Sequence, residues 1–205
     1  MSVSRSMDAT TGGAAARVAQ RRLAQPSGWW GMALFVATEA TLFGTLIGTY
    51  WYLRFRTAAW PPPGTERPEV ALPLILTGVL VATSVPMLLA ARAARAGRVA
   101  AAWLSVAAAT LVQGAYFGVQ MHLFLRDLGK VPAKSSAYAS IYHTMLGTHH
   151  AHVAVGLLLN LWVLARLLGG LTNYRVITVR VVSLYWYFVN VLAVCVVLTQ
   201  ISPSL

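Results

Sequence analysis

Five long apolar segments alternate with short polar ones along most of the chain. They cover residues 29–53, 71–91, 100–125, 140–168 and 179–201. Each is long enough to cross the hydrocarbon core of a bilayer, which takes about 20 helical residues. None shows the alternation with a period of two, over about ten residues, that is typical of transmembrane strands. The pattern therefore predicts an all-α integral membrane protein whose five transmembrane helices form one bundle over residues 27–205.

The composition agrees with a membrane protein, since 58% of the residues are hydrophobic and only 10% are charged. An average soluble domain has about 25% charged residues. Residues 1–26 are rich in Ala, Ser, Thr, Gly and Arg, and we expect them to form a disordered cytoplasmic tail. The apolar segment that follows is too long for the core of a signal peptide, so we interpret it as a true transmembrane span.

The basic residues predict how the chain is oriented in the membrane. Ten of the 16 Lys and Arg residues lie in the tail and in the second and fourth connections, and six lie on the opposite side. Because Lys and Arg are retained on the cytoplasmic side, this favours a cytoplasmic N-terminus and an outside C-terminus. The net charge of +11 then reflects topology and contact with anionic lipid headgroups. No basic face interleaved with aromatic residues points to nucleic acid.

Glu39 is a single acidic residue near the middle of an otherwise uncharged apolar segment, which aromatic residues flank on both sides. A carboxylate at this depth costs about 2.5–3.5 kcal/mol on insertion scales. We therefore expect Glu39 to be partnered, protonated or facing an interior lined by protein, and we interpret it as a site.

The fourth segment carries the densest polar cluster, made of His143, His149, His150 and His152. Residues three apart share a helix face, so His149 and His152 point roughly the same way, while His150 is turned by about 100° from His149. One interpretation is structural, with imidazoles that hydrogen-bond to other helices, to Glu39 or to a lipid headgroup. The other is a metal site, which would need ligands such as His122 or Glu39. No Cys pair or HExxH motif favours the metal.

Two further patterns concern helix geometry. Gly44 and Gly48, like Gly114 and Gly118, lie four residues apart in a span, and such pairs let helices approach closely in lipid. Pro86 lies inside the second span. Because proline removes a backbone donor, we expect a kink there.

The ordered motifs resemble one family, subunit III of the haem-copper respiratory oxidases in its short, five-helix form. Residues 30–40, WGMALFVATEA, are similar to its WGM-x-LF-x-x-SE segment, with Glu39 at the intramembrane carboxylate. Residues 60–64, WPPPG, resemble its WPP stretch. Residues 147–156 resemble GxHGxHVxxG, which places the paired histidines at His149 and His152. Residues 184–190, LYWYFVN, resemble WYWHFVD and include Trp186.

The chain also departs from the family pattern. Gln120 matches, but a different residue stands at five other positions. Leu123 replaces a glutamate, Tyr187 replaces a histidine and Asn190 replaces an aspartate. Arg180 lies where a carboxylate is common, and His150 takes the place of a glycine. The resemblance therefore indicates a divergent member with rewritten polar contacts between helices or with the catalytic subunit.

The resemblance implies a non-catalytic accessory subunit that binds no cofactor itself, with haem and copper in partner subunits. Such a subunit packs beside subunit I in a complex that also contains subunit II, holds phospholipid in a cleft between its first two helices and the rest, and supports proton uptake during oxygen reduction. We expect the polar cleft to involve Glu39, His149, His152, Trp186 and Gln120. Arg54 and Arg92 are candidate headgroup ligands, and the expected location is a bacterial-type plasma membrane.

Three alternatives remain open. Homologous subunits serve quinol oxidases and nitric oxide reductases, although the Trp60-Pro61-Pro62 stretch favours cytochrome c as the electron donor. A transporter would use Glu39 and the histidines as a proton or cation path, but no internal repeat is apparent. A freestanding metalloenzyme would have to take its ligands from only five histidines.

Overall fold

The computed structural model describes residues 27–65 and 67–204, and this part of the chain is all-helical. The elements are α2 (Ser27–Arg56), α3 (Ala71–Ala82), α4 (Ser84–Arg95), α5 (Val99–Lys130), α6 (Ala137–Leu167), α7 (Asn173–Ile201) and the 3-10 turn η1 (Ser202–Ser204). With α3 and α4 counted as one broken span, five helical segments are long and apolar enough to cross a membrane. The predicted helical bundle is therefore confirmed. The predicted tail, residues 1–26, lies outside the described residues.

Local sequence signals explain where the helices begin and end. The Ser136 side chain accepts a hydrogen bond from the Ala139 amide (3.1 Å) at the start of α6, and Thr172 caps α7 through the Arg175 amide (3.3 Å). Such caps satisfy amides that have no partner in the first helical turn. After α6, Gly170 has a φ of 85°, a left-handed conformation that glycine adopts without strain.

The second span is broken at Thr83, three residues before Pro86. A proline ring clashes with the carbonyl four residues earlier, which here belongs to Ala82, the last residue of α3. The amide and the hydroxyl of Thr83 both donate to the Leu80 carbonyl, at 3.0 and 2.6 Å. The kink predicted at Pro86 is thus confirmed, and it takes the form of a helix end followed by a new helix.

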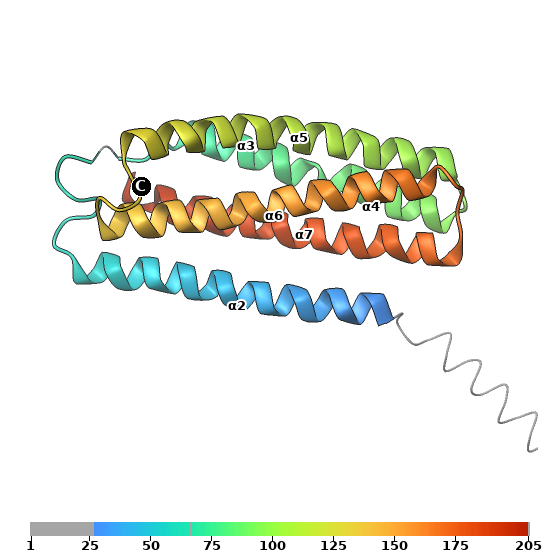
Figure 1. The fold of residues 1–205 in the computed structure, drawn as a ribbon, viewed down its shortest axis with the longest axis horizontal. Helices are drawn as coiled ribbons and strands as arrows, with labels where there is room; N and C mark the ends of the chain where they lie inside the picture. The colour runs from blue at the N-terminus through green and yellow to red at the C-terminus, as the bar shows by residue number, and fades with distance from the viewer. Residues whose placement is uncertain (1–26, 66, 205) are drawn as a thin grey trace, which may run out of the picture.

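The first two spans pack against different neighbours in the bundle. The backbone of α2 comes close to α6 and α7, whereas α3 and α4 pack against α5 and α7. Figure 1 shows α2 along one side of the bundle and α3 with α5 along the other. Within the described residues α2 and the span made of α3 and α4 do not contact each other, because α7 lies between them. The lipid cleft between the first two spans and the rest stays a prediction. Because the number of spans is odd, the start of α2 and the end of α7 lie at opposite ends of the bundle, and which end is cytoplasmic stays a prediction.

The glycine pairs do not mark the close contacts within this chain. A Cβ added at Gly44, Gly48, Gly114 or Gly118 would meet no atom within 4 Å among the described residues. The tight approach is instead at Gly156 of α6, where an added Cβ would lie 2.6 Å from the indole of Trp186 on α7. Trp186 is fully buried in the main apolar core.

Candidate functional site

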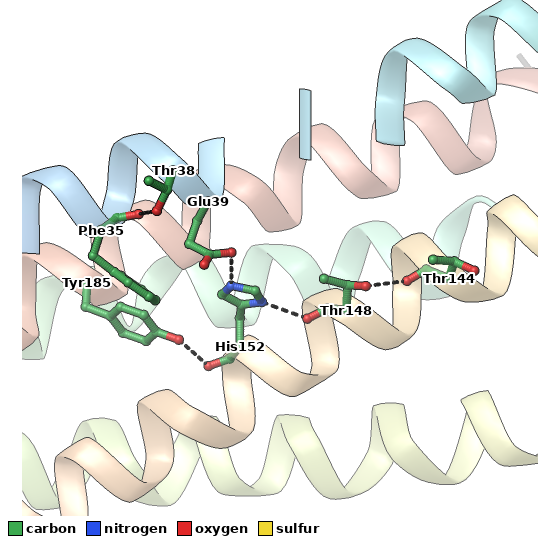
Figure 2. Close-up of polar contacts among 7 residues, drawn as sticks. All are labelled: Phe35, Thr38, Glu39, Thr144, Thr148, His152 and Tyr185. Carbon is green, nitrogen blue, oxygen red and sulfur yellow. Dashed lines mark hydrogen bonds and ion pairs between the residues drawn. The ribbon is translucent and has the colours of Figure 1, made fainter. Parts of the chain in front are cut away.

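The intramembrane carboxylate of α2 is joined to α6 by a side-chain hydrogen bond. Oε2 of Glu39 lies 2.9 Å from Nε2 of His152, and Figure 2 shows the two side chains pointing toward one another across the helix interface. Only 20% of the Glu39 side chain and 12% of the His152 side chain are exposed. His152 is therefore the partner that a carboxylate at this depth requires.

The surroundings of His152 hold its ring in one orientation. Its Nδ1 lies 2.8 Å from the Thr148 carbonyl, one turn earlier. Phe43 packs edge-on against the ring with the centroids 5.3 Å apart. The Tyr185 hydroxyl of α7 donates to the main-chain carbonyl of His152 at 2.7 Å. Three helices, α2, α6 and α7, thus meet at this histidine.

This geometry determines how many protons the two side chains carry and where they lie. A carbonyl oxygen only accepts hydrogen bonds, so Nδ1 of His152 carries a hydrogen that it donates to Thr148. One proton is then shared between Nε2 of His152 and Oε2 of Glu39. It gives either a carboxylate with an imidazolium or a carboxylic acid with a neutral imidazole. Both states have a net charge of zero, which removes most of the cost of placing an isolated charge in the membrane.

A second buried network joins four helical segments without Glu39. Trp186 Nε1 donates to Asn160 Oδ1 (2.9 Å), Asn160 Nδ2 donates to Gln113 Oε1 (2.8 Å), and Gln113 Nε2 donates to Thr83 Oγ1 (2.9 Å). Thr83 in turn donates to the Leu80 carbonyl. The first four side chains are at most 2% exposed. Trp186, which we grouped with Glu39, therefore belongs to a different polar network.

Sequence reasoning missed Thr83, Gln113 and Asn160. Each is a neutral polar residue in an apolar span, and amide side chains inside a membrane usually bond across helices. This signal was available for Gln113 and Asn160, but it does not tell which residues they contact. Only the helix arrangement brings α3, α5, α6 and α7 together at this level.

The other predicted residues of the polar cleft lie elsewhere. His149 is buried, and neither of its ring nitrogens has a hydrogen-bond partner in the described part of the chain. Its ring centroid is 6.2 Å from that of His150. Gln120 lines a cavity of about 480 Å³ near the C-terminal end of α5. Within the described residues neither His149 nor Gln120 forms a hydrogen bond with Glu39. Of the predicted cleft residues, His152 is the one that is bonded to Glu39.

The two candidate headgroup arginines differ in their surroundings. The Arg54 guanidinium donates to Oγ and the carbonyl of Ser202, at 2.6 and 3.4 Å, and it lies over the Trp51 ring. Arg54 is thus occupied in holding the end of α2 to the turn after α7. Arg92 is exposed near the end of α4, at the opposite end of the bundle from Ser202.

The positions that depart from the family pattern also have distinct places. Asn190 Nδ2 donates to Ser84 Oγ at 2.7 Å, beside the break between α3 and α4. Leu123 lines the same cavity as Gln120. Arg180 and Tyr187 line a smaller cavity at the other end. The residues that depart from the family pattern therefore lie at separate places and do not form one site.

A metal site has no ligand set within residues 27–65 and 67–204, because no three His, Cys, Asp or Glu side chains are placed to share an ion there. Glu39 and His152 form a pair, and a typical zinc site needs at least three protein ligands. In this part of the chain the geometry favours the structural interpretation of the histidines.

Comparison with known proteins gives a consistent result. The model of the family described as "Cytochrome c oxidase subunit III" matches residues 6–201. A cytochrome bo(3) ubiquinol oxidase subunit 3 of Pseudomonas aeruginosa is 32% identical, covering 82% of this chain and 80% of that protein. Cytochrome c oxidase subunit 3 of Bacillus subtilis is 31% identical, covering 80% and 79%. Quinol oxidase subunit 3 of the same organism is also 31% identical, covering 80% and 79%.

Proposed function

Because the chain belongs to the cytochrome c oxidase subunit III family of the haem-copper oxidases, we propose that it stabilises subunit I as a non-catalytic accessory subunit, in a complex that also contains subunit II. Haem and copper belong to those partners in this proposal. The bound phospholipid, the support of proton uptake and the bacterial-type plasma membrane are further parts of it.

The observation that supports the proposal is that the buried polar side chains form hydrogen bonds with one another across helices. Glu39 is bonded to His152, and Trp186, Asn160 and Gln113 are bonded to one another. These groups hold helices together, which suits a scaffold. A transporter would need polar groups that exchange partners with a cargo along a path.

The Glu39–His152 pair has a specific role in this proposal. It helps to attach α2 to the rest of the bundle, since among the described elements the α2 backbone approaches α6 and α7 and no other helix. A displaced α2 would alter the outer surface that the subunit offers to lipid and to its partners. The pair therefore supports the complex by keeping α2 in place.

The electron donor of the complex separates two candidates. The Trp60-Pro61-Pro62 stretch favours cytochrome c, and we propose a cytochrome c oxidase. The ubiquinol and quinol oxidase relatives favour a quinol-oxidising complex as the second candidate. Purified complex should oxidise reduced cytochrome c in the first case and a quinol in the second.

The first experiment is to tag the chain and purify it in mild detergent from its own host membranes. We expect haem bands in the reduced-minus-oxidised spectrum and a large multi-span partner in the mass spectrum. A chain that purifies alone and colourless would contradict the proposal and favour a transporter. A chain that carries stoichiometric metal by itself would favour the metalloenzyme instead.

The role of Glu39 is tested in the same complex. Glu39→Gln should leave assembly largely intact but shorten the activity lifetime during turnover or change lipid retention. Thr38→Val is the matched control, because Thr38 is exposed and lies next to Glu39 in the sequence. Among the described residues, its hydroxyl bonds only to its own helix, through the Phe35 carbonyl. Equal lifetimes and lipid contents for both variants and the wild type would contradict this role.

A further inference from the structure

A small cavity lies where α2 begins and α4 ends, at the end of the bundle opposite Ser202. It has a volume of about 200 Å³ and is lined by residues of α2, α4 and α7. Its apolar wall includes Trp29, Leu88 and Leu184, and its polar lining includes Arg95, Arg180 and Tyr187. The cavity thus combines aliphatic and cationic surface at the end of a membrane helix.

The charge around this cavity is positive. Arg95 and Arg180 line it, and Arg92 lies three residues before Arg95 on α4. No carboxylate lines it. Of the acidic residues that the structure describes, Glu69 and Asp127 line the cavity near Gln120, and Glu39 is bonded to His152.

Most hydrogen-bond donors at this cavity have no partner among the residues that the structure describes. Arg180 makes no hydrogen bond or ion pair within the described part of the chain, and Arg95 uses only its Nε, which donates to the Ala91 carbonyl at 3.2 Å. The Tyr187 hydroxyl is buried and has no partner among the described residues. Ser183 differs, since its hydroxyl already donates to the Val179 carbonyl at 2.8 Å.

Guanidinium groups with a phenolic donor match the oxygens of a phosphate group, which accepts several charge-assisted hydrogen bonds. Trp29 adds the amphipathic ring that membrane proteins place at headgroup level. Leu88 and Leu184 provide an apolar surface for a hydrocarbon chain. A ligand with both parts, a phosphate and a hydrocarbon chain, complements all of these residues.

We propose that this cavity binds the phosphate of an anionic phospholipid through Arg95, Arg180 and Tyr187. The inference rests on the proposed phospholipid binding, for which it names a headgroup site different from the predicted Arg54. Arg180 and Tyr187 are two of the positions where the chain departs from the family pattern, so the site is a feature of this chain. The lipid would bridge α2 and α4, whose backbones do not approach each other.

The test uses the intact complex, purified with its partners and stripped of loosely held lipid. Phosphatidylglycerol is added back in detergent, and bound lipid is counted by native mass spectrometry for the wild type, Arg180→Gln and Tyr187→Phe. Loss of a charge-assisted phosphate contact should weaken binding about tenfold in Arg180→Gln. Loss of one neutral hydroxyl should weaken binding about threefold in Tyr187→Phe.

Arg166→Gln is the matched control. Arg166 is likewise an arginine in a membrane-spanning helix, in the last turn of α6, but it stacks on Trp162 and Tyr174 and does not line the cavity. The Arg166→Gln variant should keep the wild-type affinity for phosphatidylglycerol. The same measurement with diacylglycerol, which has the hydrocarbon chains but no phosphate, tests whether the phosphate is required. We expect no specific binding of diacylglycerol. A competition experiment with inorganic phosphate tests whether the bound phosphate group belongs to a lipid or to a free anion. Displacement of the lipid by millimolar phosphate would show that a free anion binds in the cavity and would overturn the lipid assignment.

The outcomes separate this inference from the proposed function. If the haem-containing partner co-purifies and Arg180→Gln binds as much phosphatidylglycerol as Arg166→Gln, the phosphate site is wrong while the accessory role stands. If the wild-type chain never co-purifies with such a partner, the accessory role fails. Because Tyr187→Phe removes a single oxygen, its unchanged affinity in a well-assembled complex would also exclude the tyrosine from the site.

Discussion

Replacing Gly156 with alanine tests the packing of α6 against α7. The added Cβ would lie 2.6, 2.9 and 3.0 Å from three atoms of the Trp186 indole, and real Cβ atoms essentially never come as close as the first two distances. The ring has little room to retreat, because it is fully buried and its Nε1 is bonded to Asn160. Overpacking of this kind costs about 1–3 kcal/mol. A ring that moved aside would also lose its hydrogen bond, worth about 1 kcal/mol.

We therefore expect Gly156→Ala to lower the free energy of unfolding by about 2–4 kcal/mol, from overpacking and hydrogen-bond loss together. The assay is titration of the folded chain from mild-detergent micelles with sodium dodecyl sulfate, followed by circular dichroism. Gly118→Ala is the control, because its Cβ would meet no atom within 4 Å. It should be neutral or slightly stabilising, since alanine favours a helix over glycine by about 0.5–1 kcal/mol.

The clash itself is tested by combining Gly156→Ala with Trp186→Phe. A phenyl ring is smaller than the indole, so the two changes together should cost less than the sum of the single changes. Equal stability of Gly156→Ala and Gly118→Ala would refute the packing argument. Strict additivity with Trp186→Phe would show that the cost of the methyl group does not come from the indole.

Three more predictions concern the polar contacts. Glu39→Ala and His152→Ala, measured singly and together, should give a coupling energy of about 0.6–1.7 kcal/mol, as found for hydrogen bonds between membrane helices. Purely additive losses in the free energy of unfolding would show that the 2.9 Å contact contributes nothing. Gln113→Leu should destabilise the chain by about 1–3 kcal/mol, because it leaves the buried amide of Asn160 without its acceptor. Adding Asn160→Leu should not double this loss. Arg54→Ala should cost less than about 1 kcal/mol, because its contact is only partly buried, but it should increase carboxypeptidase access to the C-terminal turn.

The sequence is sufficient to predict the helices but not their neighbours. Length and apolar content identify the spans, and the ring of Pro86 accounts for the break after Ala82. In a membrane, however, lipid tails are as apolar as a packed helix face, so hydrophobic patterning does not say which face meets protein. This is why the pairs Gly44 with Gly48 and Gly114 with Gly118 pointed to contacts that the bundle does not make.

The candidate site shows the same limit at the level of single side chains. That Glu39 needs a polar partner follows from the cost of a carboxylate in lipid. Helical spacing places His149 and His152 on one broad face, but the 60° between them decides which one meets α2. The bond from His152 Nδ1 to the Thr148 carbonyl then aims its Nε2 at Glu39, whereas His149 has no such bond. These details depend on the docking of α2, which no local pattern encodes.

The single shared proton of Glu39 and His152 has an electrical consequence. The two atoms that share it are 2.9 Å apart, and the contact runs from α2 to α6. A charge that crosses the whole membrane gains about 2.3 kcal/mol per 100 mV. A shift of about 3 Å in a core of about 30 Å gains at most about a tenth of that, and less when it runs sideways. The bond between Glu39 and His152 is therefore almost independent of voltage, and it would hold equally well in an energised and in a de-energised membrane.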